Sequence, residues 1–336
     1  MLDKQIEEFV HGRHLSEGNA EAFLDSLLLE TDESRLREIF LAWNDKGIES
    51  GEIFAIAKVM RARSRKIRSQ HENFVDIVGT GGGRNKKFNV STAAAFVAAA
   101  SGVPVAKHGN KAATSRSGSS DVLCALGIDP AMSPAAAEGC LNELNLCFMF
   151  APNFHRLSPA LAAARRSLGF PTIFNCVGPL CNPAEAPNLL IGVWDRELVE
   201  KMAIALSKFG TRRSWIVHGL EGIDEISASG PTLVAEVTAG AYRTFELSPK
   251  EFGVDPMSNT EFACADADAS ASMIRRVFAG KEENSFAERL VLLNAAAAVY
   301  LTGQARSPEA AFEVVRASLR EGRPTRKLEE LAAVEI

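Results

Sequence analysis

The sequence is poor in cysteine and has no cysteine pair with the spacing of metal ligands. Its 336 residues include six cysteines, each inside or beside an apolar run, and none forms a C-x-x-C pair. Disulfide frameworks are typical of small secreted chains, and zinc sites commonly use closely spaced cysteines. We therefore predict reduced core thiols rather than disulfides or a zinc site. The six residues are Cys124, Cys140, Cys147, Cys176, Cys181 and Cys264.

The sequence also lacks a segment typical of a membrane span or of a signal peptide. Its longest strongly apolar stretch, near Leu290–Leu301, is shorter than the roughly 20 residues that a spanning helix needs, and it contains Asn294. The N-terminal stretch MLDKQIEEFV is amphipathic and acidic, unlike a secretory leader. These features predict a cytoplasmic protein without membrane contacts.

An overall excess of basic residues is absent as well. Lys and Arg number 37 against 42 Asp and Glu, so the formal net charge is −5, which argues against a nucleic-acid-binding protein. Basic residues do gather at the end of the first helical segment, at Arg61, Arg63, Arg65, Lys66 and Arg68. We interpret them as solvated cations that suit a helix C-terminus, with an anion or nucleic-acid patch as the alternative.

Hydrophobic spacing divides the chain into helical and mixed parts. Residues 1–70 place apolar side chains three and four apart, and so do Ser133–Leu168 and the C-terminal stretches, which predicts helices. From residue 74, buried strand-like runs alternate with helical runs, which is typical of an α/β domain with a largely parallel sheet. We predict a helical domain of residues 1–70, with further helices from about 133–185. The α/β domain then comprises residues 74–130 and 186–336, with a ligand cleft between the two.

A glycine-rich loop follows the first of these strands. In DIVGTGGG the glycines are Gly79 and 81–83, and NVSTAAAF opens a helix behind them, with Ser91 and Thr92 as predicted caps. Glycines let backbone N–H groups approach a ligand closely, and a helix N-terminus attracts anions. The loop has neither the G-K-[ST] ending of a P-loop nor the G-x-G-x-x-G spacing of a dinucleotide site. It predicts an anion site, with a tight turn without ligand as the alternative.

A second loop carries cations and hydroxyls together. The stretch KHGNKAATSRSGSSD, Lys107–Asp121, follows a strand-like run and holds four Lys, His or Arg side chains and five hydroxyls. Such groups suit phosphate oxygens. Ser119 or Ser120 is the predicted cap of the helix DVLCALG, which adds another helix N-terminus. The loop predicts a second part of a phosphate site rather than a merely polar loop.

Two further stretches add an acidic pair and an arginine. Asp224 and Glu225 follow a strand and a glycine turn in IVHGLEGIDE, and adjacent carboxylates suit Mg²⁺ shared with a phosphate substrate. By themselves they are more typical of a solvated surface, and the two neighbouring phosphate loops favour the metal site. Arg165 and Arg166 lie in an Ala- and Leu-rich helix, and an arginine can bind a carboxylate in bidentate geometry. The stretch GPLCNP behind them is predicted to be a rigid turn near the hinge between the two domains.

Together, the four stretches resemble the anthranilate phosphoribosyltransferase family. That family's glycine loop reads close to GTGGD…FN-[IV]-ST and its second loop KHGN…S…GS-[AS]-D. Its hinge reads FAP…H…R…TxFNxxGPLxNP, and its metal loop ends in HGxxGxDE. The match runs in order through about residues 74–228. It implies a nucleoside phosphorylase/phosphoribosyltransferase-like α/β fold, a homodimer, Mg²⁺ as cofactor, and transfer of the 5-phosphoribosyl group from phosphoribosyl pyrophosphate (PRPP) to anthranilate in tryptophan biosynthesis.

The resemblance also implies roles for individual residues. Those implied to bind PRPP are Gly79, Gly82, Gly83, Lys87, Asn89, Val90, Ser91, Thr92, Lys107, Asn110, Ser115 and Ser119. Those implied to contact anthranilate or line its path are Gly79, His108, Asn110, Pro152 and Arg165. Ser91, Asp224 and Glu225 are implied to hold the metal. No residue is implied to act as a nucleophile or strong base, so catalysis rests on orientation and charge stabilisation.

The sequence departs from the family pattern at three places. Gly83 stands where the family has an acidic residue, Lys111 where arginine is frequent, and CADADASA (264–271) where Gly-Gly is usual. The first change predicts an altered PRPP affinity or Mg²⁺ response, and the last leaves details of the domain interface open.

Three alternatives remain at this stage. A relative acting on another aromatic acceptor would share all four motifs. A pyrimidine nucleoside phosphorylase would share the fold but lacks the KHGN loop. A catalytically silent relative that binds nucleic acid would use the basic residues 61–68, against which the intact GTGG loop, the Asp224–Glu225 pair and the acidic balance argue.

Overall fold

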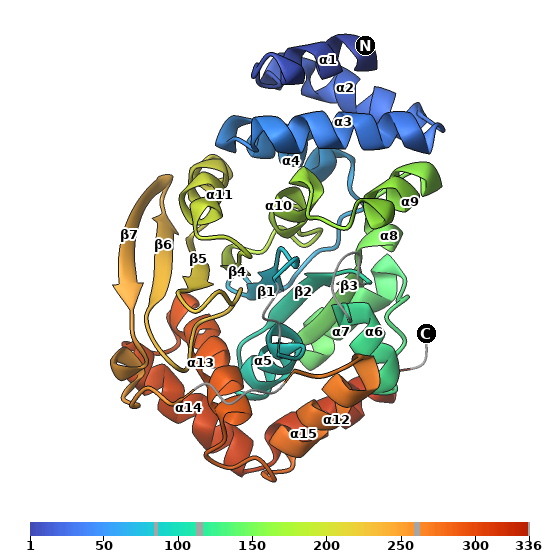
Figure 1. Ribbon diagram of the computed structural model, residues 1–336. Helices are drawn as coiled ribbons and strands as arrows, with labels where there is room; N and C mark the ends of the chain where they lie inside the picture. Colours follow the sequence, from blue (N-terminus) through green and yellow to red (C-terminus); the bar gives the residue numbers. More distant parts are fainter. Residues whose placement is uncertain (84–86, 112–116, 259–262, 335–336) are drawn as a thin grey trace.

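The computed structural model of the protein describes residues 1–83, 87–111, 117–258 and 263–334. A layer of helices at the N-terminal end sits on a sheet whose opposite face is covered by the C-terminal helices (Figure 1). Within the described residues, seven strands form one sheet in the order β3-β2-β1-β4-β5-β6-β7. Their bounds are β1 Val75–Gly79, β2 Val105–Gly109, β3 Leu146–Phe150, β4 Asn188–Gly192, β5 Arg213–Gly219, β6 Thr232–Thr238 and β7 Ala241–Leu247.

The first five strands are parallel, and β6 and β7 add an antiparallel hairpin at one edge. The predicted largely parallel sheet of an α/β fold is therefore confirmed. The prediction of a wholly helical Ser133–Leu168 was wrong, because Leu146–Phe150 forms β3. A run of five apolar residues carries no periodicity that separates a buried strand from a buried helix. Asn145, in a left-handed conformation with φ 58°, ends the preceding helix and frees the run for the sheet.

The helices predicted at the N-terminus are present. They are α1 Leu2–Val10, α2 Glu17–Leu29, α3 Glu33–Lys46 and α4 Ser50–Arg63. Phe9 stacks on Trp43 with ring centroids 4.8 Å apart, and Phe23 meets Trp43 edge-on at 5.5 Å. Beside these rings Lys46 and Glu52 form a buried ion pair of 2.8 Å. Large aromatic side chains dominate the burial that holds these four helices together.

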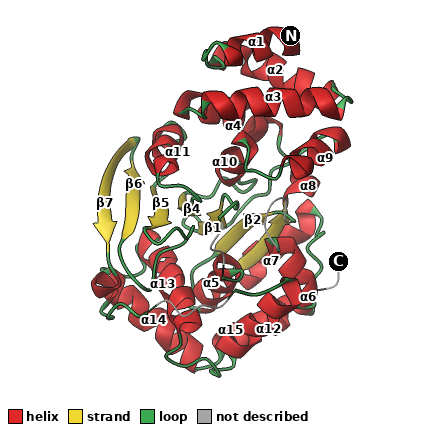
Figure 2. Cartoon of the chain, viewed as in Figure 1, coloured by secondary structure: helices red, strands yellow, loops and turns green. Residues whose placement is uncertain are grey.

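The remaining helices either connect the strands or follow β7, and they cover both faces of the sheet (Figure 2). They are α5 Val90–Ala100, α6 Ser119–Ala125, α7 Pro134–Leu144, α8 Ala151–Phe154, α9 Pro159–Leu168, α10 Ile173–Leu180, α11 Glu197–Ser207, the 3-10 turn η1 Pro249–Phe252, α12 Ala267–Phe278, α13 Phe286–Leu301, α14 Pro308–Arg320 and α15 Arg323–Ala332. Ala-rich α5 and α13 pack on each other with nearly every side chain buried. Small side chains let these two helices approach closely. This packing holds α5 in place, and its first turn follows the glycine loop in the chain.

Alternating strand residues feed two separate hydrophobic cores. Leu190 of β4 lies in a core with α5 and α13, whereas Leu189 and Ile191 lie in a core with α3, α4, α10 and α11. This is the period-two alternation of a strand that is buried on both faces. The N-terminal helices thus share one core with a face of the sheet. The boundaries predicted for the two domains, 1–70 with about 133–185 and 74–130 with 186–336, stay a prediction.

The basic residues at the end of α4 are largely neutralised by acidic residues of the same chain. Arg63 pairs with Asp25 and Glu21 of α2, while Arg61 and Lys66 both approach Glu185. Exposed pairs of this kind contribute at most about 1 kcal/mol each. They do, however, occupy the cations that a polyanion would need. The pairing favours the interpretation as a solvated helix end over a nucleic-acid patch.

Two expectations about cysteine and membranes can be compared with the structure. All six cysteines are free thiols, four of them buried, while Cys124 is exposed and Cys264 half-buried. The prediction of free thiols is confirmed, but Cys124 is not a core residue. Among the described residues, none of the helices combines the length and the apolar character that crossing a bilayer requires.

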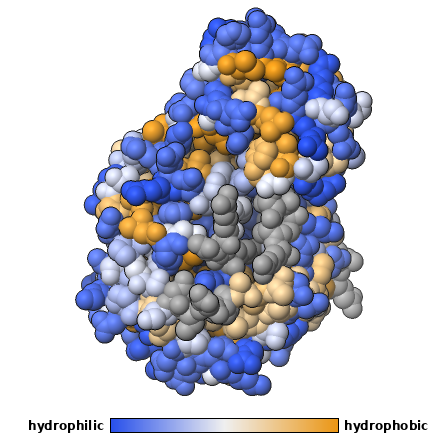
Figure 3. Space-filling model, in the orientation of Figure 1, coloured by the Kyte–Doolittle hydropathy of each residue, from blue (hydrophilic) through white to orange (hydrophobic). Residues whose placement is uncertain are grey.

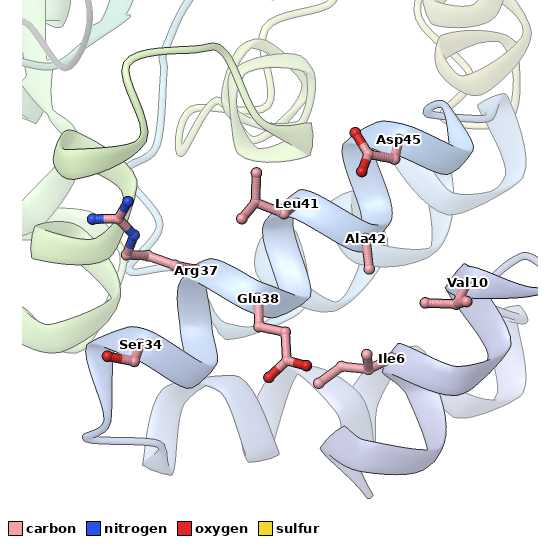
Figure 4. Close-up of a pocket in the computed structure, with 8 residues that line it drawn as sticks. All are labelled: Ile6, Val10, Ser34, Arg37, Glu38, Leu41, Ala42 and Asp45. Atoms are coloured by element: carbon pink, nitrogen blue, oxygen red, sulfur yellow. The ribbon is translucent and has the colours of Figure 1, made fainter.

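Exposed apolar residues concentrate at the N-terminal end. Among the described residues, four of the seven large hydrophobic residues that are exposed lie within the first 41 positions, and orange residues are visible around these helices in Figure 3. Ile6 and Val10 of α1 and Leu41 and Ala42 of α3 line a groove of about 450 Å³, drawn in Figure 4. None of the predicted site residues lines this groove.

Candidate active site

The predicted binding residues meet at the carboxyl ends of the parallel strands, where ligands of α/β sheets bind. Gly79, Gly109, Gly192 and Gly219 end β1, β2, β4 and β5. The glycine loop is attached to β4, because the backbone N–H of Thr80 donates to the carbonyl of Gly192 at 2.9 Å. The loops that follow these four strand ends therefore share one edge of the sheet.

Glycine is required in this loop for space as well as for conformation. A Cβ on Gly82 would lie 2.5 Å from Cγ of Pro171, and its φ of +82° disfavours any other residue. A Cβ on Gly79 would lie 3.3 Å from Oδ2 of Asp224, and one on Gly83 would lie 3.1 Å from Oδ1. The glycine loop and the acidic turn after β5 therefore lie close together.

The carboxylate of Asp224 fits a metal ligand. Its Oδ1 is buried and has no hydrogen-bond partner within the described residues, which is costly for a carboxylate oxygen unless a cation or another donor meets it. Glu225 follows it and is 8% exposed. The described residues hold no group of three or more Asp, Glu, His or Cys side chains suited to a metal ion. A cation here would draw its other ligands from substrate oxygens, which suits Mg²⁺.

A buried lysine lies under the start of α5. Lys107 is 2% exposed, and its Nζ donates to the carbonyl of Ile77 and, at 3.2 Å, to Oγ of Ser91. Asp76, fully buried one residue before Ile77, accepts from Nδ2 of Asn182 at 2.7 Å. Burial raises the pKa of Asp76 to about 7, while Lys107 acts in the opposite direction. The side-chain nitrogen of Lys107 therefore lies beside the N-terminal turn of α5.

Both predictions of helix caps were wrong. Helix α5 begins after Asn89, so Ser91 and Thr92 lie in its first turn. Helix α6 begins at Ser119, and its N-cap residue is Gly118 rather than Ser119 or Ser120. The side chain of Asn89 does not cap α5, because its Oδ1 accepts hydrogen bonds from the hydroxyls of Ser117 and Ser270 instead. The hydroxyl of Thr92 is buried without a partner within the described residues, and that of Ser91 accepts from Lys107.

The second loop folds back on the end of β2. Oγ of Ser119 donates to the carbonyl of Asn110 at 3.3 Å, and a Cβ on Gly109 would lie 2.1 Å from that Oγ. Asn110 itself is exposed at the edge of the sheet. Ser115, also predicted to bind PRPP, lies outside the described residues. Lys87 is described, and its carbonyl accepts from the N–H of Cys264 at 2.7 Å.

Arg165 is a half-buried cation on the helical side of the site. Its guanidinium lies 5.1 Å from the ring of Phe174, and its Nε is buried without a partner among the described residues. Burial lowers its pKa from 12.5 to about 10. The neighbouring Arg166 is exposed. A desolvated guanidinium with an unused donor favours an anionic ligand, and a planar carboxylate matches its geometry.

Asn175, to which the motifs assigned no role, connects this arginine to the glycine loop. Its Oδ1 accepts from the N–H of Thr172 at 3.0 Å and lies 3.5 Å from Nη2 of Arg165. Its Nδ2 donates to the carbonyl of Thr80 at 3.0 Å. One amide thus joins α10, α9 and the loop after β1. The sequence held no signal for this contact, because the partners are 95 residues apart.

Two histidines are buried together beside the hinge. Nδ1 of His108 lies 3.2 Å from the carbonyl of Gly178, Nε2 of His155 lies 3.0 Å from that of Cys181, and the rings are 5.1 Å apart. Burial lowers the pKa of His108 to about 3 and that of His155 to about 4. Both rings are therefore neutral at pH 7, and Nε2 of His108 has no partner among the described residues.

The turn predicted for GPLCNP was only half right. Gly178, Pro179 and Leu180 form the end of α10, and the chain leaves the helix at Cys181. Pro179 lacks a backbone N–H, so α10 loses one backbone hydrogen bond there. The helix is not continued beyond Leu180. Pro152, predicted to line the acceptor's path, is exposed on the short helix α8.

The buried histidines predict a pH-dependent stability. Below pH 6.5 the unfolded chain protonates His155, but the folded protein does not until about pH 4, so stability falls as the pH falls through this window. At pH 5 this amounts to about 2 kcal/mol. We expect His155→Gln to be less stable than wild type at pH 7.5, by about 1 kcal/mol for the lost hydrogen bond, and to lose less stability on acidification.

Denaturant unfolding of both proteins between pH 7.5 and 5 measures this difference. Comparing the two proteins at the same pH cancels the contributions of other titrating groups to the free energy of unfolding. Asp76 is one of these groups, and its raised pKa increases stability as the pH falls. His11→Gln, at an exposed position, is the matched control. A constant gap between His155→Gln and wild type across the range would contradict the prediction.

Comparisons with known proteins agree with this geometry. The profile of the family described as "Glycosyl transferase family, a/b domain" matches residues 71–325. The anthranilate phosphoribosyltransferase of Moorella thermoacetica is 39% identical over 99% of this chain and 98% of its own length. The crystal structure of the Thermus thermophilus enzyme of that name superposes with a TM-score of 0.87, at 36% identity and 98% coverage of both chains. That of Saccharomyces cerevisiae, in complex with PRPP and Mg, superposes with a TM-score of 0.86, at 27% identity over 98% of this chain and 96% of its own. The chain belongs to the anthranilate phosphoribosyltransferase family.

Proposed function

We propose that this protein transfers the 5-phosphoribosyl group of PRPP to the amine of anthranilate, releases pyrophosphate, and so serves tryptophan biosynthesis. The observation that carries the proposal is the joining of two anion sites by Asn175. On one side lies the glycine loop with the carboxylate of Asp224, and on the other the buried guanidinium of Arg165. A donor and an acceptor that are both anionic need two such sites side by side.

The donor site is built for a pyrophosphate. The residues proposed to bind PRPP are Gly79, Gly82, Gly83, Lys87, Asn89, Val90, Ser91, Thr92, Lys107, Asn110, Ser119 and, outside the described residues, Ser115. The buried Lys107 and the helix N-terminus favour negative charge on the leaving group as it develops. The relative from Saccharomyces cerevisiae was solved with PRPP and Mg, which supports the same donor here.

Mg²⁺ is proposed as the cofactor. Asp224 and Glu225 would hold it with Ser91, and the orphaned Oδ1 of Asp224 fits a cation. When bound, the ion would supply positive charge that stabilises pyrophosphate as a leaving group. The protein itself holds the carboxylate of Asp224 close to the glycine loop. A Cβ at position 79 or 83 would lie within 3.3 Å of a carboxylate oxygen, so glycine leaves the space that this approach needs.

The acceptor site positions anthranilate rather than activating it. Arg165 would bind the carboxylate, with Gly79, His108, Asn110 and Pro152 along the path. An arylamine is largely unprotonated at neutral pH, so the site needs no strong base. The neutral, buried His108 fits a lining residue rather than a catalytic base. Holding the amine against C1′ of the ribose supplies the rate acceleration through orientation.

The test is a fluorescence assay that follows the loss of anthranilate with PRPP and Mg²⁺ present. Turnover that needs all three components and stops with EDTA is the expected result. Folded protein that binds PRPP without consuming anthranilate would assign another aromatic acceptor to the same site. Failure both to bind PRPP and to turn over would overturn the proposed function.

A homodimer is proposed as the working form, on the strength of the family alone. Sedimentation at micromolar concentration tests it directly, because the mass of one chain is 36.1 kDa. A species of that mass at the concentration of the assay would contradict it.

The replacement of the family's acidic residue by Gly83 predicts a measurable change in the metal response. A Cβ at this position would lie 3.1 Å from Oδ1 of Asp224, so Gly83→Asp puts a second carboxylate beside the first. Like charges this close are unfavourable without a cation between them. We expect the variant to change the Mg²⁺ concentration for half-maximal activity or the PRPP KM at least about threefold. Because about 1.4 kcal/mol corresponds to tenfold, a threefold change needs only about half that free energy.

Gly83→Ala separates charge from size, because it adds the same Cβ without the carboxylate. Initial rates over a Mg²⁺ titration at fixed PRPP, and over a PRPP titration at fixed Mg²⁺, give both constants. Unchanged constants in Gly83→Asp, or equal changes in the two variants, would contradict the electrostatic explanation.

A further inference from the structure

A small buried cluster ties three distant segments to the proposed donor site. Oδ1 of Asn89 accepts from Oγ of Ser117 at 2.7 Å and from Oγ of Ser270 at 2.9 Å. The backbone N–H of Asn89 donates to the same Oγ of Ser270 at 3.0 Å. Ser270 lies in α12, is fully buried, and is 181 residues away from Asn89. Neither composition nor the family motifs assigned it a role.

The hydrogen bonds of Ser270 fix which way the amide of Asn89 points. A serine hydroxyl has one proton to donate. Because Oγ of Ser270 already accepts from the backbone N–H of Asn89, the favourable partner for its own proton is an acceptor, and Oδ1 of Asn89 lies within reach. Oγ of Ser117, from the other loop, donates to the same Oδ1. The carbonyl side of the amide is thereby taken, and the NH₂ side faces away from both hydroxyls.

This orientation matters because the ligand proposed here is anionic. An asparagine amide presents either an acceptor or two donors, depending on its flip. Phosphate oxygens need donors, and an amide oxygen turned toward them would be repelled. The segment before α12 also supports the glycine loop directly, since the N–H of Cys264 donates to the carbonyl of Lys87 at 2.7 Å. The region where the sequence departs from the family's Gly-Gly thus packs against the donor loop.

We propose that Ser270 is a positioning residue that locks the amide of Asn89 with its NH₂ group toward PRPP. The proposal rests on the proposed function, because it takes PRPP as the ligand of Asn89. It predicts an effect confined to the donor. Ser270→Ala should raise the KM for PRPP about tenfold, the size expected for one misdirected hydrogen bond to a charged group, and leave the KM for anthranilate within about twofold.

Three variants separate positioning from general destabilisation. Ser270→Thr keeps the hydroxyl and should restore most of the PRPP affinity. In an Asn89→Ala background, Ser270→Ala should add no further loss, since residues that act through one another are non-additive. Ser318→Ala is the control, because Ser318 is 1% exposed on α14 and its hydroxyl has no partner among the described residues. It should change neither KM, and thermal melting monitors folding of all variants.

The measurements are initial rates over PRPP and anthranilate titrations, with calorimetric binding of PRPP in Mg²⁺ as the second readout. An unchanged PRPP KM in Ser270→Ala, an equal rise in both KM values, or additivity with Asn89→Ala would overturn the proposal. An inactive wild type refutes the proposed function separately. In that case a roughly tenfold weaker binding of PRPP by Ser270→Ala still supports the positioning role, and an unchanged affinity, or no PRPP binding by wild type, overturns it.

Discussion

Replacing Arg165 with methionine is expected to raise the KM for anthranilate about 100-fold while the KM for PRPP stays within about twofold. A bidentate arginine–carboxylate contact in a desolvated site is among the strongest polar interactions, and 100-fold corresponds to about 2.7 kcal/mol. The guanidinium is buried against Phe174, and burial lowers its pKa to about 10, so it is costly to leave unpaired. That cost should be relieved only when the carboxylate binds.

The same reasoning predicts the sign of the stability change. Replacing a largely desolvated charge that has no anionic partner among the described residues by an apolar side chain of similar length removes a desolvation cost. Arg165→Met should therefore unfold at the same or a higher denaturant concentration than wild type, although its activity falls. A loss of activity with a matching loss of stability would instead mean that Arg165 is structural.

Arg166→Met is the matched control for this experiment. It changes the charge by the same amount one residue further along α9, at an exposed side chain. Its KM values should equal those of wild type. A similar rise in the KM for anthranilate in both variants would mean that Arg165 acts through the field of α9 rather than through direct contact. If Arg165→Met turned over an acceptor that lacks a carboxylate faster than wild type does, this would confirm that Arg165 contacts the carboxylate of anthranilate.

The two arginines of α9 show which features of the site can be predicted from local sequence and which depend on the tertiary fold. The order of strand, loop and helix around Asp76–Ala100 followed from local patterns, because glycine and capping residues act within a few positions. The burial of Arg165 did not follow, since α9 has arginines at two successive positions and nothing local separates them. Its burial is decided by Phe174 and Asn175 of α10, which the fold brings into contact.

The incorrect cap predictions have the same physical origin. Ser, Thr and Asn favour helix N-termini because their side chains satisfy free backbone N–H groups. At the start of α5 the side chain of Asn89 is instead held by Ser117 and Ser270, which come from 28 and 181 residues away. Tertiary partners thus override a local preference of about 1 kcal/mol. Such exceptions are expected at functional sites, and here they lie at the proposed PRPP site.

Replacing Asp224 with asparagine is expected to lower kcat/KM for PRPP at least about 1,000-fold, because it removes a charged ligand from the proposed Mg²⁺ site. Asparagine keeps the size of the side chain, so the close contacts with Gly79 and Gly83 stay possible. Calorimetric titration of Mg²⁺ with PRPP present should show weaker coupling between the two ligands. Glu225→Gln should act in the same direction.

Stability again separates a ligand-binding carboxylate from a structural one. Oδ1 of Asp224 has no partner within the described residues, so neutralising it should not destabilise the protein without ligands and removes an uncompensated cost. Asp45→Asn, at an exposed position of α3, is the charge-matched control and should be fully active. If Asp224→Asn retained activity with an unchanged Mg²⁺ profile, the metal would have to lie elsewhere. If it unfolded instead, the carboxylate would be holding the glycine loop rather than a cation. Low activity in a variant as stable as wild type is the one combination that assigns the side chain to the metal.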